Sequence, residues 1–162
     1  PLESGKGMDE LGFLRLLRSQ FTLDWGGIHG IAHWERVREN GLRLAGLTGA
    51  KPRVVGLFAL LHDSKRESDG HDPEHGPRAA DFARTLAGTM FDLDAEDLDL
   101  LAVACRDHSE GFTQGDVTAV TCWDADRLDL GRVGVKPNPR LLCTAAARDA
   151  AIIEWAYARS LR

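Results

Sequence analysis

The sequence lacks two features that would indicate particular partners. Its longest uninterrupted apolar stretch runs from Val54 to Leu61, which is far short of the roughly 20 residues that a membrane-spanning helix needs. It also has no excess of positive charge, because the formal net charge is -5. A protein of this kind does not attract nucleic acid or anionic lipid through its overall field. We therefore expect no membrane and no nucleic acid polymer as partner, and any substrate phosphate must meet local cations.

Paired cysteines and a secretion signal are absent as well. The three cysteines, Cys105, Cys122 and Cys143, are odd in number and far apart, which is typical of reduced, buried thiols in a cytoplasmic protein. No charged and then apolar leader with a small-residue cleavage site precedes the rest of the chain. The segment 1–7 has no periodicity and stands before Met8. We interpret it as a cloning remnant and place the domain at residues 8–162.

Strand signals are scarce, and helical spacing of apolar residues dominates the chain. No Asn-Gly or Asp-Gly pair lies between β-branched runs, so no hairpin is expected. The 162 residues, 43% of them hydrophobic, suit one domain. The sequence therefore predicts an all-α fold, a single compact bundle of about six to seven helices. The expected helices cover residues 8–20, 25–47, 53–62, 73–87, 94 onward, 116–128 and 139–160.

The helix predicted over 53–62 is almost entirely apolar, which predicts a central position in the bundle. It ends in the adjacent pair His62 and Asp63. The segment 64–75 that follows is polar and rich in Asp and Gly, as expected of a loop over a site. A buried Asp63 without a partner would carry a large desolvation penalty, which a bound cation removes. The end of this helix is therefore the first candidate for a metal site.

Histidines occur together with acidic residues or glycine in several segments, and a divalent metal needs imidazoles and carboxylates from more than one element. The informative segments are HGIAHWERV from His29, LLHDSKR from Leu60, HDPEHG from His71, RDHSEG from Arg106 and WDADRLD from Trp123. Their order along a helical chain matters more than any one of them. The sequence therefore indicates one metal centre assembled from distant helices.

These segments resemble the HD-domain superfamily of metal-dependent phosphohydrolases. The pattern of that family is a histidine on one helix, a His-Asp doublet and a later aspartate. The matching metal ligands here are His33, His62, Asp63 and Asp124. Asp126 and Asp129 compete with Asp124 for the last place, and the Asp-Arg-Leu-Asp run fits the tail of the family best when Asp124 is the ligand.

The resemblance leaves the number of ions open at one or two. In dinuclear members of the superfamily, two further histidines bind a second ion that the doublet aspartate bridges to the first. His75 and His108 match those histidines and are predicted as further metal ligands. Either of them could instead orient a phosphate, and His108 is therefore also a candidate for substrate binding. The mixed nitrogen and oxygen ligands favour manganese, iron, cobalt, nickel or zinc.

Catalytic and substrate-binding roles follow for residues beside the ligands. His29 precedes His33 by four residues, so on a helix both would share one face. This spacing is similar to the His-Asn-x-x-His segment of cyclic-nucleotide phosphodiesterases, with Gly30 in place of the asparagine. The spacing makes His29 a candidate general acid, and His75 is an alternative proton donor. Otherwise His29 would contact a metal ligand or the substrate. Lys65 and Arg66 are the candidate phosphate-binding cations.

The resemblance implies a metal-dependent phosphohydrolase that acts on a small phosphomonoester, nucleotide or phosphodiester through a metal-activated water. Asp63 would orient that water, and Arg66 would stabilise the developing charge. Two other functions stay open. The same set of four histidines and two aspartates is similar to that of di-iron oxygenases on this fold, and a noncatalytic nucleotide-binding module is the third possibility. The sequence does not determine the oligomeric state.

Overall fold

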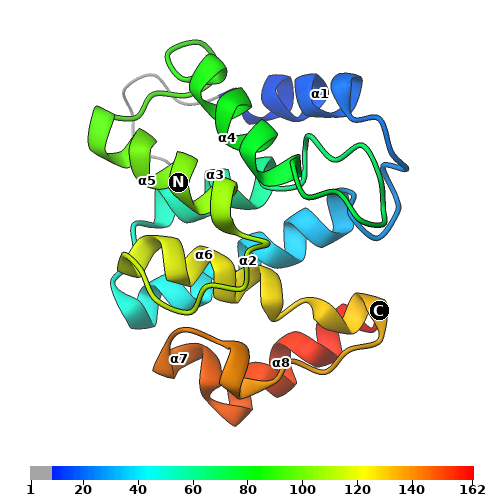
Figure 1. The fold of residues 1–162 in the computed structure, drawn as a ribbon, viewed down its shortest axis with the longest axis vertical. Helices are drawn as coiled ribbons and strands as arrows, with labels where there is room; N and C mark the ends of the chain where they lie inside the picture. Colours follow the sequence, from blue (N-terminus) through cyan, green and yellow to red (C-terminus); the bar gives the residue numbers. More distant parts are fainter. Residues whose placement is uncertain (1–8) are drawn as a thin grey trace.

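Helices form the part of the chain that the computed structural model describes, residues 9–162, and no strand occurs in that part (Figure 1). The proposed cloning remnant, residues 1–7, lies outside the described residues. The helices are α1 (Glu10–Gln20), α2 (Ile31–Thr48), α3 (Pro52–Leu61), α4 (His75–Leu86), α5 (Ala95–Asp107), α6 (Val117–Arg127), α7 (Ala145–Arg148) and α8 (Ala150–Ser160), with two short 3-10 helices, η1 (Leu130–Val133) and η2 (Pro139–Leu141). The predicted all-α fold is confirmed.

Helix α3 lies at the centre of the bundle, where α2, α5 and α6 all pack against it. Pro52 opens the helix, a position at which proline costs no hydrogen bond. Seven of its ten residues are buried, including Phe58 and Leu61. Burial of side chains of this size stabilises a fold by about 1.5–3 kcal/mol each. The apolar sequence of α3 thus places its last turn, and the residues that follow it, deep inside the protein.

Helix α2 begins later than predicted, at Ile31 and not at residue 25. The reason is a tight turn in which the amide of Ile31 donates to the carbonyl of Trp25 at 2.9 Å. A Cβ on Gly30 would lie only 2.0 Å from that carbonyl oxygen, so the turn requires glycine. His29 consequently lies in the turn before α2, and the prediction that His29 and His33 share one helical face is wrong.

The last predicted helix, 139–160, is also wrong, because the structure divides it into η2, α7 and α8. The hydroxyl of Thr144 accepts from the amide of Ala147 at the start of α7. The carboxylate of Asp149 accepts from the amide of Ala151 and starts α8. Side chains that satisfy the first amides of a helix favour a new start at that point. Two such caps within six residues break the segment.

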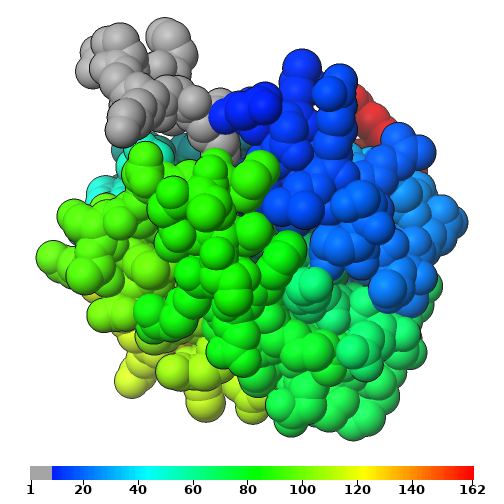
Figure 2. Space-filling view, turned by 90° about the horizontal axis from the view of Figure 1, so that it is seen from above, coloured from blue at the N-terminus to red at the C-terminus, as the bar shows by residue number. Residues whose placement is uncertain are grey.

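After the buried residues 62–64, the rest of the connection between α3 and α4, residues 65–74, lies at the surface beside α4 and the α1–α2 connection (Figure 2). Asp72 organises it by accepting from the amide of Glu67 at 2.7 Å and from the guanidinium of Arg78 at 2.7 and 2.8 Å. The three cysteines are free, as predicted, but Cys143 is half-buried, whereas Cys105 and Cys122 are buried. Within the described residues, no helix has both the length and the apolar character to span a membrane.

Candidate metal centre

Asp63 lies at the centre of a buried cluster of histidines. Its side chain is 3% exposed, and each of its oxygens faces a different pair of imidazoles. One oxygen, Oδ2, lies 3.3 Å from His33 Nε2 and 3.4 Å from His62 Nε2. The other, Oδ1, lies 3.3 Å from His75 Nε2 and 3.4 Å from His108 Nε2. The structure therefore forms two groups of metal-ligand atoms that share a single carboxylate.

Four separate elements supply these histidines. His33 lies on the first turn of α2, and His62 directly follows α3. His75 is the first residue of α4, and His108 directly follows α5. Since the polar groups sit at or near helix ends, the apolar bodies of the helices remain in the core. The sequence prediction that these four residues and Asp63 come together is what the structure shows.

All four imidazoles present Nε2 to the cluster because an oxygen atom engages Nδ1. His62 Nδ1 donates to the carbonyls of Phe58 and Ala59 at 3.2 and 3.1 Å. His75 Nδ1 donates to the carbonyl of Asp72, and His108 Nδ1 donates to that of Cys105 at 2.6 Å. A carbonyl oxygen can only accept, so in the neutral ring the proton is on Nδ1 and the lone pair is on Nε2. This is the tautomer that a metal ligand requires.

The nitrogen atoms of each imidazole pair have the separation expected of two ligands on one metal ion. His33 Nε2 and His62 Nε2 are 3.1 Å apart, and His75 Nε2 and His108 Nε2 are 2.9 Å apart. Two nitrogens with lone pairs repel each other at such a separation unless a proton or a metal cation lies between them. With metal–nitrogen bonds of about 2.1 Å, neighbouring ligands on one ion are separated by about 3.0–3.4 Å. The close approach of the two imidazole pairs is thus what shared coordination would produce.

The structure corrects the choice among the three aspartates at the end of α6. Asp126 Oδ1 lies 3.2 Å from His33 Nε2 and 3.3 Å from His62 Nε2. The predicted ligand, Asp124, instead accepts from the amide of Cys143 at 2.7 Å and from the amide and hydroxyl of Thr144 at 2.9 and 2.7 Å. Residues two apart on a helix point about 200° apart, so only one of these carboxylates can face the histidines. Asp126 is the one that does.

Replacement of Asp124 by alanine is expected to destabilise the fold without removing metal ligands. Three donors of Cys143 and Thr144 would lose their acceptor, which we expect to cost about 2–5 kcal/mol of unfolding free energy in total. Denaturant unfolding of the metal-free protein measures this loss. The matched variant Asp126→Ala should show the opposite pattern, with less metal per folded chain and a smaller loss of stability. Loss of metal in the Asp124 variant alone would restore the original assignment.

The pKa values of Asp63, Asp126 and His33 depend on one another. Burial by itself would raise the pKa of Asp63, but His62, His108, His33 and His75 hold that pKa well below its usual value. Burial likewise opposes the charge of Asp126, yet His62 and His33 keep its pKa well below the usual value. Burial lowers the pKa of His33, whereas Asp126, Asp129 and Asp63 outweigh it and raise the pKa to about 10. Both carboxylates are therefore ionised, and the cluster favours positive charge.

His29 is 6% exposed and lies outside the ligand groups. Its Nδ1 is 2.8 Å from Asp69 Oδ1, an aspartate on the loop after α3. Burial lowers the pKa of His29 more than Asp69 and Asp63 raise it. At neutral pH the ring is thus mainly uncharged, donates Nδ1–H to Asp69 and carries its lone pair on Nε2. The structure places His29 beside the cluster, as a group able to exchange a proton.

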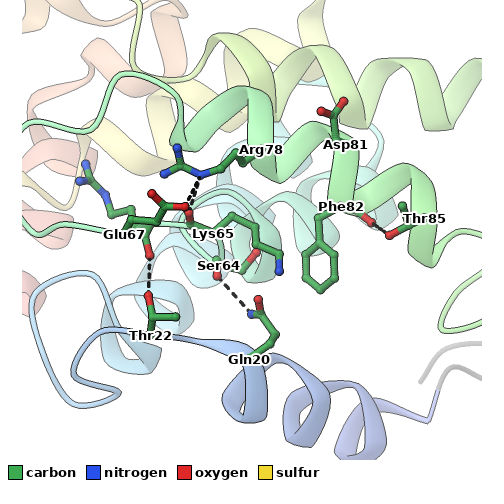
Figure 3. Close-up of a pocket in the computed structure, with 10 residues that line it drawn as sticks. Gln20, Thr22, Ser64, Lys65, Glu67, Arg78, Asp81, Phe82 and Thr85 are labelled. Atoms are coloured by element: carbon green, nitrogen blue, oxygen red, sulfur yellow. Dashed lines mark hydrogen bonds and ion pairs between the residues drawn. The ribbon is translucent and has the colours of Figure 1, made fainter.

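The two predicted phosphate-binding cations lie in different places. Arg66 remains at the cluster, since its Nε is 3.4 Å from Asp63 Oδ1 and its Nη1 donates to the carbonyls of Ser68 and Gly70. Lys65 instead reaches across a pocket of about 400 Å³, where its Nζ lies 4.1 Å from the centre of the Phe82 ring (Figure 3). None of the four clustered histidines lines this pocket. The structure therefore does not bring Lys65 to the cluster.

Two residues near the cluster are not predicted from the sequence, Asp69 and Arg132. Arg132 Nε donates to the carbonyl of Ile28 at 2.8 Å, and its Nη1 donates to the carbonyl of Asp129 at 3.0 Å. These contacts hold its charge close enough to contribute to the lowered pKa of His29 and to offset part of the rise in the pKa of His33. Neither residue belongs to a motif that marks a site. The contacts bridge 40 residues for Asp69 and 104 for Arg132, so no local pattern could have revealed them.

Comparison with known proteins gives one informative likeness. No protein-family model and no curated protein matches the chain. A solved structure that does match is that of a predicted HD superfamily hydrolase from an uncultured Thermotogales bacterium. The two chains are 30% identical with a TM-score of 0.69, over 91% of this chain and 84% of the other. The likeness thus spans almost the whole chain, and this chain belongs to the HD superfamily.

Proposed function

We propose that this protein is a metal-dependent phosphohydrolase with two divalent transition-metal ions at its centre. The observation that carries the proposal is the position of Asp63, whose two oxygens face two separate pairs of imidazoles. His33, His62 and Asp126 would hold one ion, and His75 and His108 would hold the other. Asp63 would bridge them. This arrangement supports two ions better than one, because no single position lies between all four nitrogens and both oxygens of Asp63.

A divalent transition metal, when bound, polarises a phosphoryl oxygen and lowers the pKa of coordinated water from about 15.7 towards about 7. The chain itself contributes binding, orientation and proton transfer. Asp63, ionised and buried, orients the attacking water. Arg66 is positioned next to Asp63 by the carbonyls of Ser68 and Gly70, so its remaining N–H groups are able to contact a phosphate. We assign the same role to Arg132, whose charge also lies near His29.

The substrate class follows from the scale and charge of the site. The described residues form one small helical domain of net acidic composition, and the cations beside the cluster are few and local. Arg66 and Arg132 suit one phosphate group better than a polymer backbone, which needs a continuous row of positive charge. We therefore propose a small phosphomonoester, nucleotide or phosphodiester as the substrate.

We assign His29 to proton transfer, with Asp69 as the residue that orients its ring: the uncharged ring takes up a proton at Nε2 from the attacking water and then delivers that proton to the leaving oxygen. The variant His29→Ala is expected to lower turnover by about 10²–10⁴-fold, the usual contribution of a positioned acid or base. Metal content should not change, because His29 is outside both ligand groups. Stopped assays with metal analysis of the same sample measure both quantities. A parallel loss of metal would make His29 a structural residue of the centre.

The proposal as a whole is tested by elemental analysis together with hydrolysis assays. Purified protein is reconstituted with manganese, iron, cobalt, nickel or zinc in turn. Phosphate or nitrophenol release is then followed with p-nitrophenyl phosphate, bis-p-nitrophenyl phosphate and nucleoside monophosphates. We expect near two ions per chain and metal-dependent hydrolysis of at least one substrate class. Binding of a nucleotide without hydrolysis by any metal form would instead support the noncatalytic module.

A di-iron oxygenase is the second candidate, because the structure keeps the numbers of histidines and aspartates on which that alternative rests. Asp126 replaces Asp124, so four histidines and two aspartates still surround the centre. The two functions differ in their co-substrate. Oxygen consumption by the iron-loaded protein in the absence of phosphoester hydrolysis would favour the oxygenase. Hydrolysis under anaerobic conditions would favour the phosphohydrolase.

A further inference from the structure

His33 differs from the other three clustered histidines in what holds its Nδ1. The carbonyls of Phe58, Ala59, Asp72 and Cys105 are the acceptors for His62, His75 and His108. His33 Nδ1 faces a side chain, Asp129 Oδ2, at 2.6 Å. A backbone carbonyl always accepts, whereas a side chain is able to present an acceptor or a donor depending on its identity. The tautomer of His33 is therefore the only one of the four that side chains determine.

Asp129 is fully buried and is itself held by Arg36. Arg36 Nε donates to Asp129 Oδ1 at 2.7 Å, and Arg36 lies three residues after His33 on the same helix. The amide of Asp129 donates to the carbonyl of Asp126 at 3.0 Å, which links it to a proposed ligand. Asp129 contacts the ring nitrogen of His33 that points away from the cluster. Asp129 therefore contacts His33 from the side away from the cluster and is not itself a metal ligand.

We propose that Arg36 and Asp129 are positioning residues that fix His33 in the Nδ1–H tautomer and thereby set the metal affinity of the group formed by His33, His62 and Asp126. This inference rests on the proposed metal centre. Arg36 has only donors and stays charged, so it always requires an acceptor from residue 129. The carboxylate satisfies Arg36 with one oxygen and keeps the other for His33 Nδ1–H. Arg36 therefore orients Asp129, and Asp129 orients His33.

Asparagine at position 129 would break this chain of contacts in a defined way. The stronger, charge-assisted contact with Arg36 takes the single amide oxygen. The amide nitrogen, which only donates, then faces His33 Nδ1 and favours the tautomer with the proton on Nε2. That proton occupies the direction in which the metal should lie. The near-isosteric change Asp129→Asn is thus expected to impair His33 as a ligand although no ligand atom is removed.

Removal of the arginine should reverse the defect. In the double variant Arg36→Met with Asp129→Asn, the amide oxygen is free to turn towards His33 and to accept from Nδ1–H. We expect Asp129→Asn to weaken zinc binding at this group by about 10–100-fold, as for other residues that orient metal-bound histidines. The double variant should bind zinc at least about 5-fold more tightly than Asp129→Asn. The single variant Arg36→Met keeps an acceptor at position 129 but removes the donor that orients it, and should weaken zinc binding by less than Asp129→Asn does.

The experiment measures zinc affinity by competition with a chelator and ligand geometry by the visible spectrum of the cobalt-loaded protein. Circular dichroism confirms that each variant is folded, and the double variant covers the case in which Asp129→Asn folds poorly. Equal zinc affinity in Asp129→Asn and wild type would overturn the proposal. If Asp129→Asn and the double variant bind zinc equally weakly, the proposed role of Arg36 would be overturned. A wild-type protein that takes up no zinc or cobalt would refute the metal centre as a whole, which is a distinguishable result.

Discussion

Replacement of Asp63 by alanine is expected to remove both metal ions and to abolish turnover. Asp63 is the one residue shared by the two groups of ligand atoms, so its loss takes an oxygen ligand from each ion at once. The two imidazole pairs would then lose the carboxylate that lies between them, and Asp126 would remain beside His33 and His62 alone. Helicity should persist, because Asp63 follows α3 and contributes no side chain to its hydrogen bonds. Elemental analysis after dialysis gives the metal content, and circular dichroism gives the helicity.

The thermal response to metal provides a second measure of the same variant. A ligand that binds only the folded state stabilises it by about 4 kcal/mol at 1,000 times its dissociation constant. We expect added zinc to raise the unfolding temperature of the wild-type protein and to leave that of Asp63→Ala unchanged. The control is Asp126→Ala, which should lose the ion of only one group and keep part of the shift. An Asp63 variant that still binds two ions would show that the carboxylate is not a bridge.

The core of this site is readable from the sequence because its signals are local. The apolar run of α3 and the doublet at its end together predict a buried carboxylate, and a buried carboxylate needs a cation or a donor. His75 and His108 were also predictable as members of the site, since each stands at the boundary between a helix and a polar segment. Polar side chains at such boundaries are able to meet one another while the bodies of the helices form the core. The all-α class follows from the same periodicity.

The remaining assignments depend on contacts between distant segments. Asp124, Asp126 and Asp129 all lie near the end of α6, and the sequence does not show which of them faces α2. The choice is set by Cys143 and Thr144, which engage Asp124 from 19 and 20 residues away. The prediction for His29 fails for a different reason. The position of His29 depends on a tight turn, and only the close approach of Gly30 to the carbonyl of Trp25 reveals that turn. By contrast, Thr144 and Asp149 are ordinary capping residues, and the break before α8 was open to prediction.

Gly76 is expected to be essential for the second pair of histidines. A Cβ at this position would lie 2.6 Å from the carbonyl oxygen of Arg106 and 2.8 Å from that of Cys105. The carbonyl of Cys105 also accepts from His108 Nδ1, and His75 is the neighbour of Gly76 in the chain. The close contact of α4 with the end of α5 therefore brings His75 Nε2 to within 2.9 Å of His108 Nε2. Gly76 therefore permits the approach of His75 to His108 without contacting the proposed metal centre.

Replacement of Gly76 by alanine should push α4 away from those carbonyls, because backbone atoms cannot move aside as a flexible side chain does. We expect about 1–3 kcal/mol of lost stability and a selective loss of the ion between His75 and His108, while the ion at His33 and His62 remains. Metal content per chain should fall by half, and turnover should fall with it. The control Gly46→Ala meets nothing within 4 Å and should be neutral or stabilising, by up to about 1 kcal/mol. Full metal content in Gly76→Ala would show that the second pair tolerates separation, and the bridging role of Asp63 would then have to hold over a wider spacing.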